Sequence, residues 1–166
     1  MEIERKYRIG GFPGDAEGWP LLKAAVVHQG YLATSPTVRI RETHTTYPEE
    51  KTTYILCFKG DGTLVRQEIE LPLEAETFGQ LQELLPAPMM RKDYRVYALP
   101  DGHRLECSLV DGNEPDGLYY AEVEFDSVEE SEAFIPPAFL GPEATEDPAF
   151  SMSEYWLTKL NRAKTE

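Results

Sequence analysis

Apolar and polar residues alternate along most of this chain, in short stretches separated by turn-forming residues. A period of two is typical of β-strands, because successive side chains of a strand point to opposite faces. The alternation predicts strands at residues 2–9, 37–44, 53–59, 65–71, 91–98, 103–110 and 118–125. Asp-Gly pairs within 59–63, 99–102 and 110–117 indicate tight connections, since these residue types tolerate a positive φ. The pattern therefore predicts a mostly antiparallel sheet.

Helical patterns are fewer. Residues 20–27 begin with a proline, which suits the first position of a helix, and residues 74–85 space their apolar side chains along one stripe. Residues 127–134 have serine and glutamate at capping-box spacing. Residues 153–166 carry Trp156 on an apolar face that suits docking against the sheet. We expect a few helices packed around the strands.

The polar faces of the predicted strands are charged. In the first strand Glu2, Glu4 and Lys6 share one face, opposite Ile3 and Tyr7. The same parity groups further acids and bases on the later strands: Arg39, Arg41, Lys59, Arg66, Glu68, Glu70, Arg91, Asp93, Arg95, Glu122 and Glu124. A sheet with one wet face alternates too, but so many paired charges with so few neutral polar residues fit that explanation poorly.

A closed or strongly curled sheet with a polar interior explains the charges better. Two carboxylates held about 5 Å apart repel each other by about 3 kcal/mol at an effective dielectric constant of about 20. Such a cluster needs compensation, which divalent cations can supply for the glutamates and a polyanion for the arginines and lysines. A solvated sheet face is the weaker interpretation.

Composition narrows the choice of partners. The chain has 166 residues, a net charge of −14 and an isoelectric point near 4.6. Its length fits a single domain over residues 1–166. The acidic balance argues against nucleic acid or an anionic membrane as partner, and leaves room for a small anion only where basic residues gather locally.

Cysteine usage and segment hydrophobicity bear on location. Cys57 and Cys107 lack the spacing of metal ligands, which favours reduced thiols in a core. The sequence has no signal-peptide pattern and no apolar run of membrane-spanning length. We expect a cytoplasmic protein, with a secreted one still open.

Several motifs follow one another in a fixed order. The chain opens with “EIERK” (2–6), an ExExK motif. The later motifs are “QGYL” (29–32), “VRIR” (38–41), “FKGDG” (58–62), “RQEIE” (66–70), “LEC” (105–107), “AEVEF” (121–125) and “LGPEAT” (140–145). With these motifs the sequence resembles the CYTH, or triphosphate tunnel metalloenzyme, family. The resemblance implies a mostly β, α+β fold: an eight-stranded antiparallel β-barrel that forms a tunnel with a polar interior and a few packed helices.

The resemblance also implies a triphosphate-containing small molecule as ligand, Mg²⁺ or Mn²⁺ as cofactor, and a role for each matching residue. The phosphate-binding residues would be Lys6, Arg39, Arg41, Lys59, Arg66, Arg91 and Arg95. The metal ligands would be Glu2, Glu4, Glu122 and Glu124, supported by Glu68 and Glu70. Catalysis would fall to Lys6, Glu4 and Glu106. The residue types suit these roles, since guanidinium forks match phosphate oxygens and Mg²⁺ prefers a few carboxylates.

Three positions depart from the family pattern. Asp93 stands where a second basic residue is usual, so that either Arg95 replaces it or Asp93 is a new metal ligand. Ser108 stands where an aspartate is common, and Ala149 stands where a basic residue is usual. These departures leave the substrate preference open.

The leading hypothesis is metal-dependent hydrolysis of a triphosphate, most simply inorganic tripolyphosphate. Within the same family, activity like that of a class IV adenylate cyclase or a thiamine triphosphatase is the alternative, and both would need a place for the organic group. A non-catalytic protein that binds polyphosphate or nucleotides is the alternative from another class. The oligomeric state stays open, a homodimer included.

Overall fold

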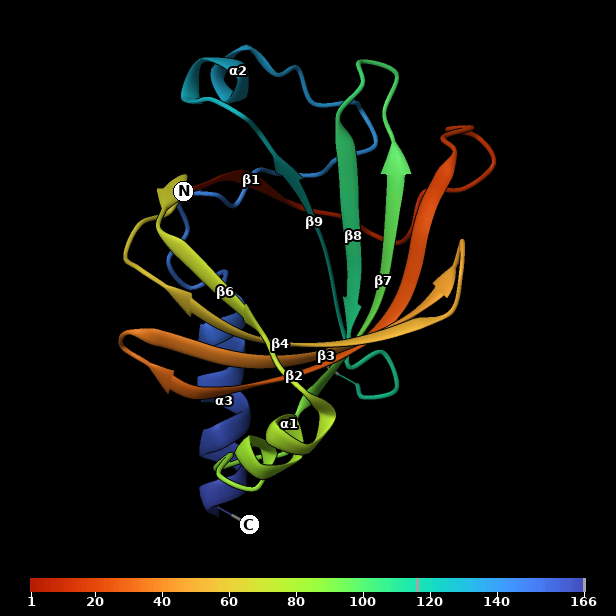
Figure 1. The fold of residues 1–166 in the computed structure, drawn as a ribbon. Helices are drawn as coiled ribbons and strands as arrows, with labels where there is room; N and C mark the ends of the chain where they lie inside the picture. Colours follow the sequence, from red (N-terminus) through yellow and green to blue (C-terminus); the bar gives the residue numbers. More distant parts are fainter. Residues whose placement is uncertain (116, 166) are drawn as a thin grey trace.

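The fold is a single antiparallel sheet curled into a nearly closed barrel (Figure 1). The structure is a computed structural model, and it describes residues 1–115 and 117–165. The strands run in the order β5-β1-β9-β8-β7-β2-β3-β4-β6. Their bounds are β1 (Glu2–Arg8), β2 (Leu21–Thr34), β3 (Thr37–Tyr47), β4 (Lys51–Lys59), β5 (Val65–Arg66), β6 (Glu68–Pro72), β7 (Met90–Ala98), β8 (Arg104–Val110) and β9 (Leu118–Glu124). All seven predicted strands are present.

The barrel closes through one bent segment. Only Gln67 separates β5 from β6, so the two form a continuous stretch that the sequence predicts as one strand. Its first part pairs with β1 and its second with β4, the strands next to the two ends of the sheet order. Counting this segment once gives the predicted eight-stranded barrel. In such a barrel, alternate side chains of each strand point into the interior and out of it.

Helices cover the ends of the barrel: α2 (Val128–Ala133) lies at one end, and α1 (Ala75–Gln82) and α3 (Met152–Thr165) at the other (Figure 1). The predicted N-cap of α2 is present, since Ser127 Oγ accepts a hydrogen bond of 3.0 Å from the Glu130 backbone N–H, while the Glu130 carboxylate accepts from the Asp126 backbone N–H instead of closing the full capping box. Trp156 of α3 is 1% exposed and packs against Tyr31, confirming its predicted packing role. Residues 116 and 166, within the predicted 110–117 connection and C-terminal helix, lie outside the described residues.

The helix predicted at 20–27 is wrong, because this segment begins β2. Pro20 and two alanines fit a helix locally, but β2 pairs along its length with β3 on one side and β7 on the other. Ladder bonding to two neighbours outweighs a weak helix propensity. Alternate residues Ala25 and Val27 are buried, which is the burial period of a strand.

The apolar core lies outside the barrel's charged interior, in two clusters of buried side chains. One surrounds Tyr7, Leu105 and Val123, and the other lies beneath α3 around Met90 and Trp156. Both cysteines are buried and unpaired, as expected of reduced thiols. None of the helices among the described residues combines the length and the apolar character needed to cross a membrane.

Candidate active site

The interior of the barrel holds a cavity of about 220 Å³ lined almost entirely by charged and polar side chains. Every strand contributes to it, and so do the first residues of α3, with Ser151 just before them. The predicted acids that line it are Glu2, Glu4, Glu68, Glu70, Glu106, Glu122 and Glu124. The predicted bases that line it are Lys6, Arg39, Arg41, Lys59 and Arg66. The alternation seen in the sequence thus corresponds to an inward face.

Three glutamates form a cluster of the size a metal ion needs. Carboxylate oxygens of Glu2, Glu4 and Glu124 lie within 4.8 Å of one another. They come together because Glu4 of β1 pairs in register with Glu124 of β9, and Glu2 lies two residues earlier on the same face. A few carboxylates, completed by substrate phosphates and water, are the ligand set that Mg²⁺ prefers. The donor set therefore fits the Mg²⁺ or Mn²⁺ that the sequence resemblance implies.

The pKa values of neighbouring carboxylates in this region are shifted in different directions. Burial, followed by repulsion from Glu122, holds the pKa of Glu4 well above its usual value. Burial also acts to raise the pKa of Glu122, but a hydrogen bond with Glu4 and the nearby Lys6 lower it more, so Glu122 stays ionised. Burial and the charges of Glu106 and Glu2 raise the pKa of Glu124 to about 7. Without a cation, the cluster binds protons to limit its own repulsion.

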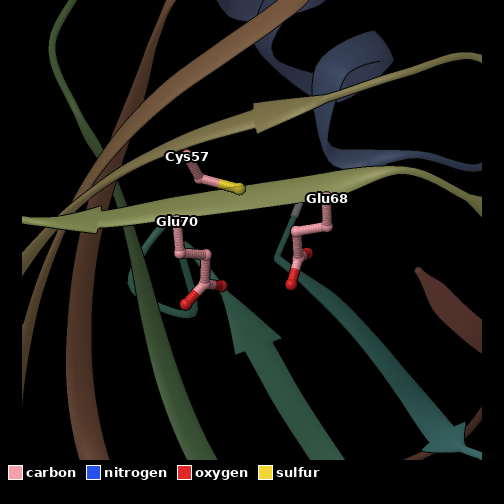
Figure 2. Close-up of side chains that lie close together, drawn as sticks. All are labelled: Cys57, Glu68 and Glu70. Carbon is pink, nitrogen blue, oxygen red and sulfur yellow. The ribbon is translucent and has the colours of Figure 1, made fainter.

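A second group of acids lies on β6, next to the first. Figure 2 shows the Glu68 and Glu70 side chains pointing the same way beside Cys57 of β4, and potential ligand atoms of the three lie within 4.8 Å of one another. Mg²⁺ and Mn²⁺ favour oxygen over sulfur, so the carboxylates are the relevant donors here. Lys59 joins the two acidic groups, with its Nζ 3.0 Å from Glu2 and 3.2 Å from Glu68.

The basic side chains differ in how freely they can meet an anion. Lys6 and Arg66 already contact Glu4, at 3.7 and 3.5 Å. Arg39 is 6% exposed, and its Nε has no hydrogen-bond partner among the described residues. Burial acts to lower the pKa of Arg39, but interaction with Tyr31 and Cys57 raises it further, so its positive charge is secure. Buried cations with unpaired donors are what a phosphate chain would require.

The predicted positions of Arg91 and Arg95 are wrong, since both lie outside the cavity. The Arg91 side chain is 52% exposed and contacts Asp93 at 3.4 Å, and the Arg95 guanidinium lies 4.1 Å from the centre of the Phe12 ring. The cause is register: Lys92 pairs with Val27, an inward residue of β2, so the even positions of β7 face inward. Asp93 therefore does not replace a basic residue of the site.

The inward residues of β7 are Lys92 and Tyr94, which the sequence analysis missed. Lys92 is buried and donates a hydrogen bond of 3.1 Å to the Tyr120 hydroxyl. Burial, with the nearby Arg41, holds the pKa of Lys92 well below its usual value. The Tyr94 hydroxyl donates to Glu106, whose pKa burial raises. The sequence offered one signal for this face, because Lys92 and Tyr94 are two residues apart and so share one side of the strand.

Further cavity residues that were not predicted include Lys23 and Tyr31 of β2, and others come from β3, β4, β9 and the α3 region. Lys23 belongs to the segment that was predicted as a helix, so its facing could not be predicted, whereas Tyr31 lies beyond that segment in a stretch for which no strand was predicted. Of the two remaining departures from the family pattern, Ser108 is buried but absent from the cavity lining. Ala149 lines a separate hollow at the start of α3. Neither residue places a charge in the cavity.

A nearly closed antiparallel barrel with acids and bases facing each other across its interior defines a site for a cation together with a polyanion. The chain is similar to a curated protein of Nitrosomonas europaea named inorganic triphosphatase. The two are 36% identical over 150 residues, covering 88% of this chain and 90% of the relative. No protein-family profile matches the chain.

Solved structures agree with this relative. The crystal structure of the inorganic triphosphatase NE1496 has a TM-score of 0.63 and 31% identity, covering 95% of each chain. A structure from Hippeastrum, described by its dominant triphosphatase activity, shares the fold at a TM-score of 0.58 and 18% identity, covering 80% of this chain and 83% of that one. The chain belongs to the CYTH, or triphosphate tunnel metalloenzyme, family.

Proposed function

We propose that the protein hydrolyses inorganic tripolyphosphate inside the barrel, with Mg²⁺ or Mn²⁺ as cofactor. One observation carries the proposal: acids clustered for a cation line the same cavity as a set of basic side chains, among them the buried Arg39 with its unpaired Nε. The Nitrosomonas relative, whose name states this activity, supports the same substrate. Fourteen of the side chains that line the cavity are Glu, Lys or Arg, which favours a highly charged ligand.

Each set of residues would have a distinct task. Glu2, Glu4, Glu122 and Glu124 would hold the cation, and the basic residues Arg39, Arg41, Lys59 and Lys92 would hold the phosphates. When bound, the cation would neutralise phosphate oxygens and make a coordinated water more acidic. Side chains of the cavity would orient the attacking water, take its proton and stabilise the charge that develops.

The attacking water would be oriented by Glu106. This carboxylate faces the cavity, is held by the Tyr94 hydroxyl and has a raised pKa, so it can take a proton from water. The water oxygen would bond to the terminal phosphorus as the bond from that phosphorus to the bridging oxygen breaks. Diphosphate would leave, and Lys6 would stabilise the charge that develops on the reacting groups.

A phosphate-release assay tests the proposal. Purified protein is given tripolyphosphate, ATP or thiamine triphosphate, each with Mg²⁺ or Mn²⁺ and again with chelator, while cyclic AMP is measured in the ATP arm. We expect metal-dependent release that is fastest from tripolyphosphate. Glu122→Gln should abolish it, whereas Arg91→Ala, a charge change outside the barrel, should leave it unchanged.

Other results would contradict the proposal. Faster turnover of ATP or thiamine triphosphate would identify an organic triphosphate as substrate, and cyclic AMP would indicate a cyclase. Tight binding of tripolyphosphate by calorimetry without phosphate release under any metal would make the protein a non-catalytic binder.

A further inference from the structure

Gln29 of β2 is a fully buried polar residue with one half of its amide in use. Its side chain is 0% exposed, and its Oε1 accepts a hydrogen bond of 3.2 Å from Arg41 Nε. The two residues are cross-strand partners in the β2–β3 register, so their side chains leave the sheet side by side on its inner face. The other half of the amide, Nε2, is buried and has no hydrogen-bond partner among the described residues.

The unpaired Nε2 indicates why a glutamine occupies this position. A buried donor without a partner is destabilising, so stability alone favours an apolar side chain of similar volume here. The amide cannot be turned over, because its NH₂ group would then face the Arg41 N–H, donor against donor. The position therefore sacrifices stability to keep an acceptor next to Arg41 Nε.

The acceptor fixes the plane of the Arg41 guanidinium. With Nε held by Gln29, the two terminal nitrogens stay free, and no described residue accepts a hydrogen bond from either of them. Arg41 lines the cavity, so these nitrogens form an open fork on its wall. A preoriented fork binds a phosphate without first losing the rotational freedom of the side chain.

The next residues of β2 repeat the arrangement. Tyr31 is the cross-strand partner of Arg39, just as Gln29 is of Arg41. Gly30 between them faces outward, where an added Cβ would lie 2.7 Å from Leu85 Cδ1 and 3.3 Å from a ring carbon of Trp156. The close packing on that side holds the strand in place behind the two inward side chains.

We propose that Gln29 is the positioning residue for Arg41, holding its guanidinium at Nε so that the terminal nitrogens face the phosphates of the substrate. The proposal rests on the proposed function for the identity of that substrate. Gln29 itself has no exposed surface and does not touch the ligand. Its effect passes through Arg41 alone.

The test is a double-mutant cycle on Gln29→Met and Arg41→Ala. Met is close to glutamine in volume and removes both amide functions. Binding of tripolyphosphate is measured by calorimetry with Mn²⁺ present, in proteins that all also carry Glu106→Gln so that the ligand is not hydrolysed, and stability is measured by thermal unfolding. We expect Gln29→Met to weaken binding roughly 10-fold to 100-fold, as for the loss of one hydrogen bond to a charged group, with an unchanged or higher Tm. In the Arg41→Ala background the same change should have no further effect.

A second readout needs no substrate. The Nε–H of Arg41 should exchange slowly with solvent in the NMR spectrum of the parent and faster in Gln29→Met, while Gln29→Glu, which keeps an acceptor, should retain the protection. His28→Ala, on the same strand but the opposite face, is the control and should change neither readout. If Gln29→Met does not fold, Gln29→Asn shortens the same amide beyond reach of Arg41.

The outcomes separate the two proposals. Parental affinity in Gln29→Met, equal losses in both backgrounds of the cycle, or unaltered Nε–H exchange would each overturn the role of Gln29. Failure of the parent protein to bind tripolyphosphate would instead overturn the proposed function, and the NMR comparison would still decide whether Gln29 fixes Arg41.

Discussion

Replacing Glu4 by glutamine should separate metal binding from folding. Glu4 is 2% exposed and lies in the three-glutamate cluster with Glu2 and Glu124. The substitution removes one negative charge and keeps the shape of the side chain. If the cluster holds the cation, the variant should lose its response to metal while remaining folded.

The local charges allow the effect on folding to be estimated. Each of the two carboxylate neighbours in the cluster lies within 4.8 Å, so at an effective dielectric constant of about 20 each repels an ionised Glu4 by about 3 kcal/mol or more, and Glu122 adds further repulsion. Lys6 at 3.7 Å and Arg66 at 3.5 Å attract it by about 4 to 5 kcal/mol each. Glutamine also avoids the desolvation of a buried charge. These contributions oppose one another, so the free energy of unfolding should change by less than about 2 kcal/mol.

The assay is thermal unfolding with chelator and with Mn²⁺. At 100 times its dissociation constant, a cation that binds only the folded state stabilises it by about 2.7 kcal/mol. For a chain of this size that corresponds to a rise in Tm of roughly 5 to 10 °C. The parent should show this rise, and Glu4→Gln should show less than about 2 °C.

Asp93→Asn is the matched control, since it removes a carboxylate from the outer face of β7 and should keep the full rise. A Glu4→Gln protein that Mn²⁺ stabilises as much as the parent would show that this cluster is not the metal site. A variant that is unfolded in chelator would refute the charge balance worked out above.

Three further predictions concern single side chains. Arg41→Ala should weaken tripolyphosphate binding by about 2 kcal/mol in calorimetry. Arg5→Ala removes an ion pair with Glu143 outside the cavity, so it should lower Tm and leave the affinity unchanged. Equal losses of affinity in the two variants would contradict the strand-face assignment. Lys6→Met should stay folded with a low kcat at saturating substrate and metal, and recovery of kcat at high Mn²⁺ would mean that Lys6 merely neutralises Glu4. Burial acts to lower the pKa of His103, but its hydrogen bonds to two carboxylates raise it overall. The stabilisation that protonated His103 gives the fold should therefore be complete below about pH 6.5 and lost as the pH rises through the raised pKa. A His103→Gln protein whose Tm falls equally over that pH range would contradict this prediction.

Strands with one apolar and one charged face could be predicted from the sequence. In β1 the side chains of Ile3 and Tyr7 pack outward in the apolar core, so the alternate residues must face inward. Glu2, Glu4 and Lys6 line the cavity as expected. The same holds for β3 and β9, whose arginines and glutamates alternate with apolar residues. Burial of the apolar face fixes the register of such a strand, and the charged face follows.

The facing of β7 could not be predicted, because it carries charge on both sides. Arg91 and Asp93 share one parity and Lys92 the other, so local alternation favours the wrong face. The pairing of Lys92 with Val27 decides the question, and Val27 belongs to the segment that was predicted as a helix. One error in element type therefore hid inward residues of two neighbouring strands, Lys23 of β2 and Lys92 of β7.

The cavity also explains how a strongly acidic protein can admit a polyanion. Seven carboxylates and seven Lys or Arg side chains line it, so its formal charge is zero although the chain as a whole carries −14. The excess negative charge therefore lies outside the cavity lining. A triphosphate brings several negative charges into a neutral space of low dielectric constant, which is unfavourable unless cations enter with it. Divalent cations at the glutamate cluster would restore the balance beside the basic residues, so under the proposed function the charge distribution favours metal and substrate binding together.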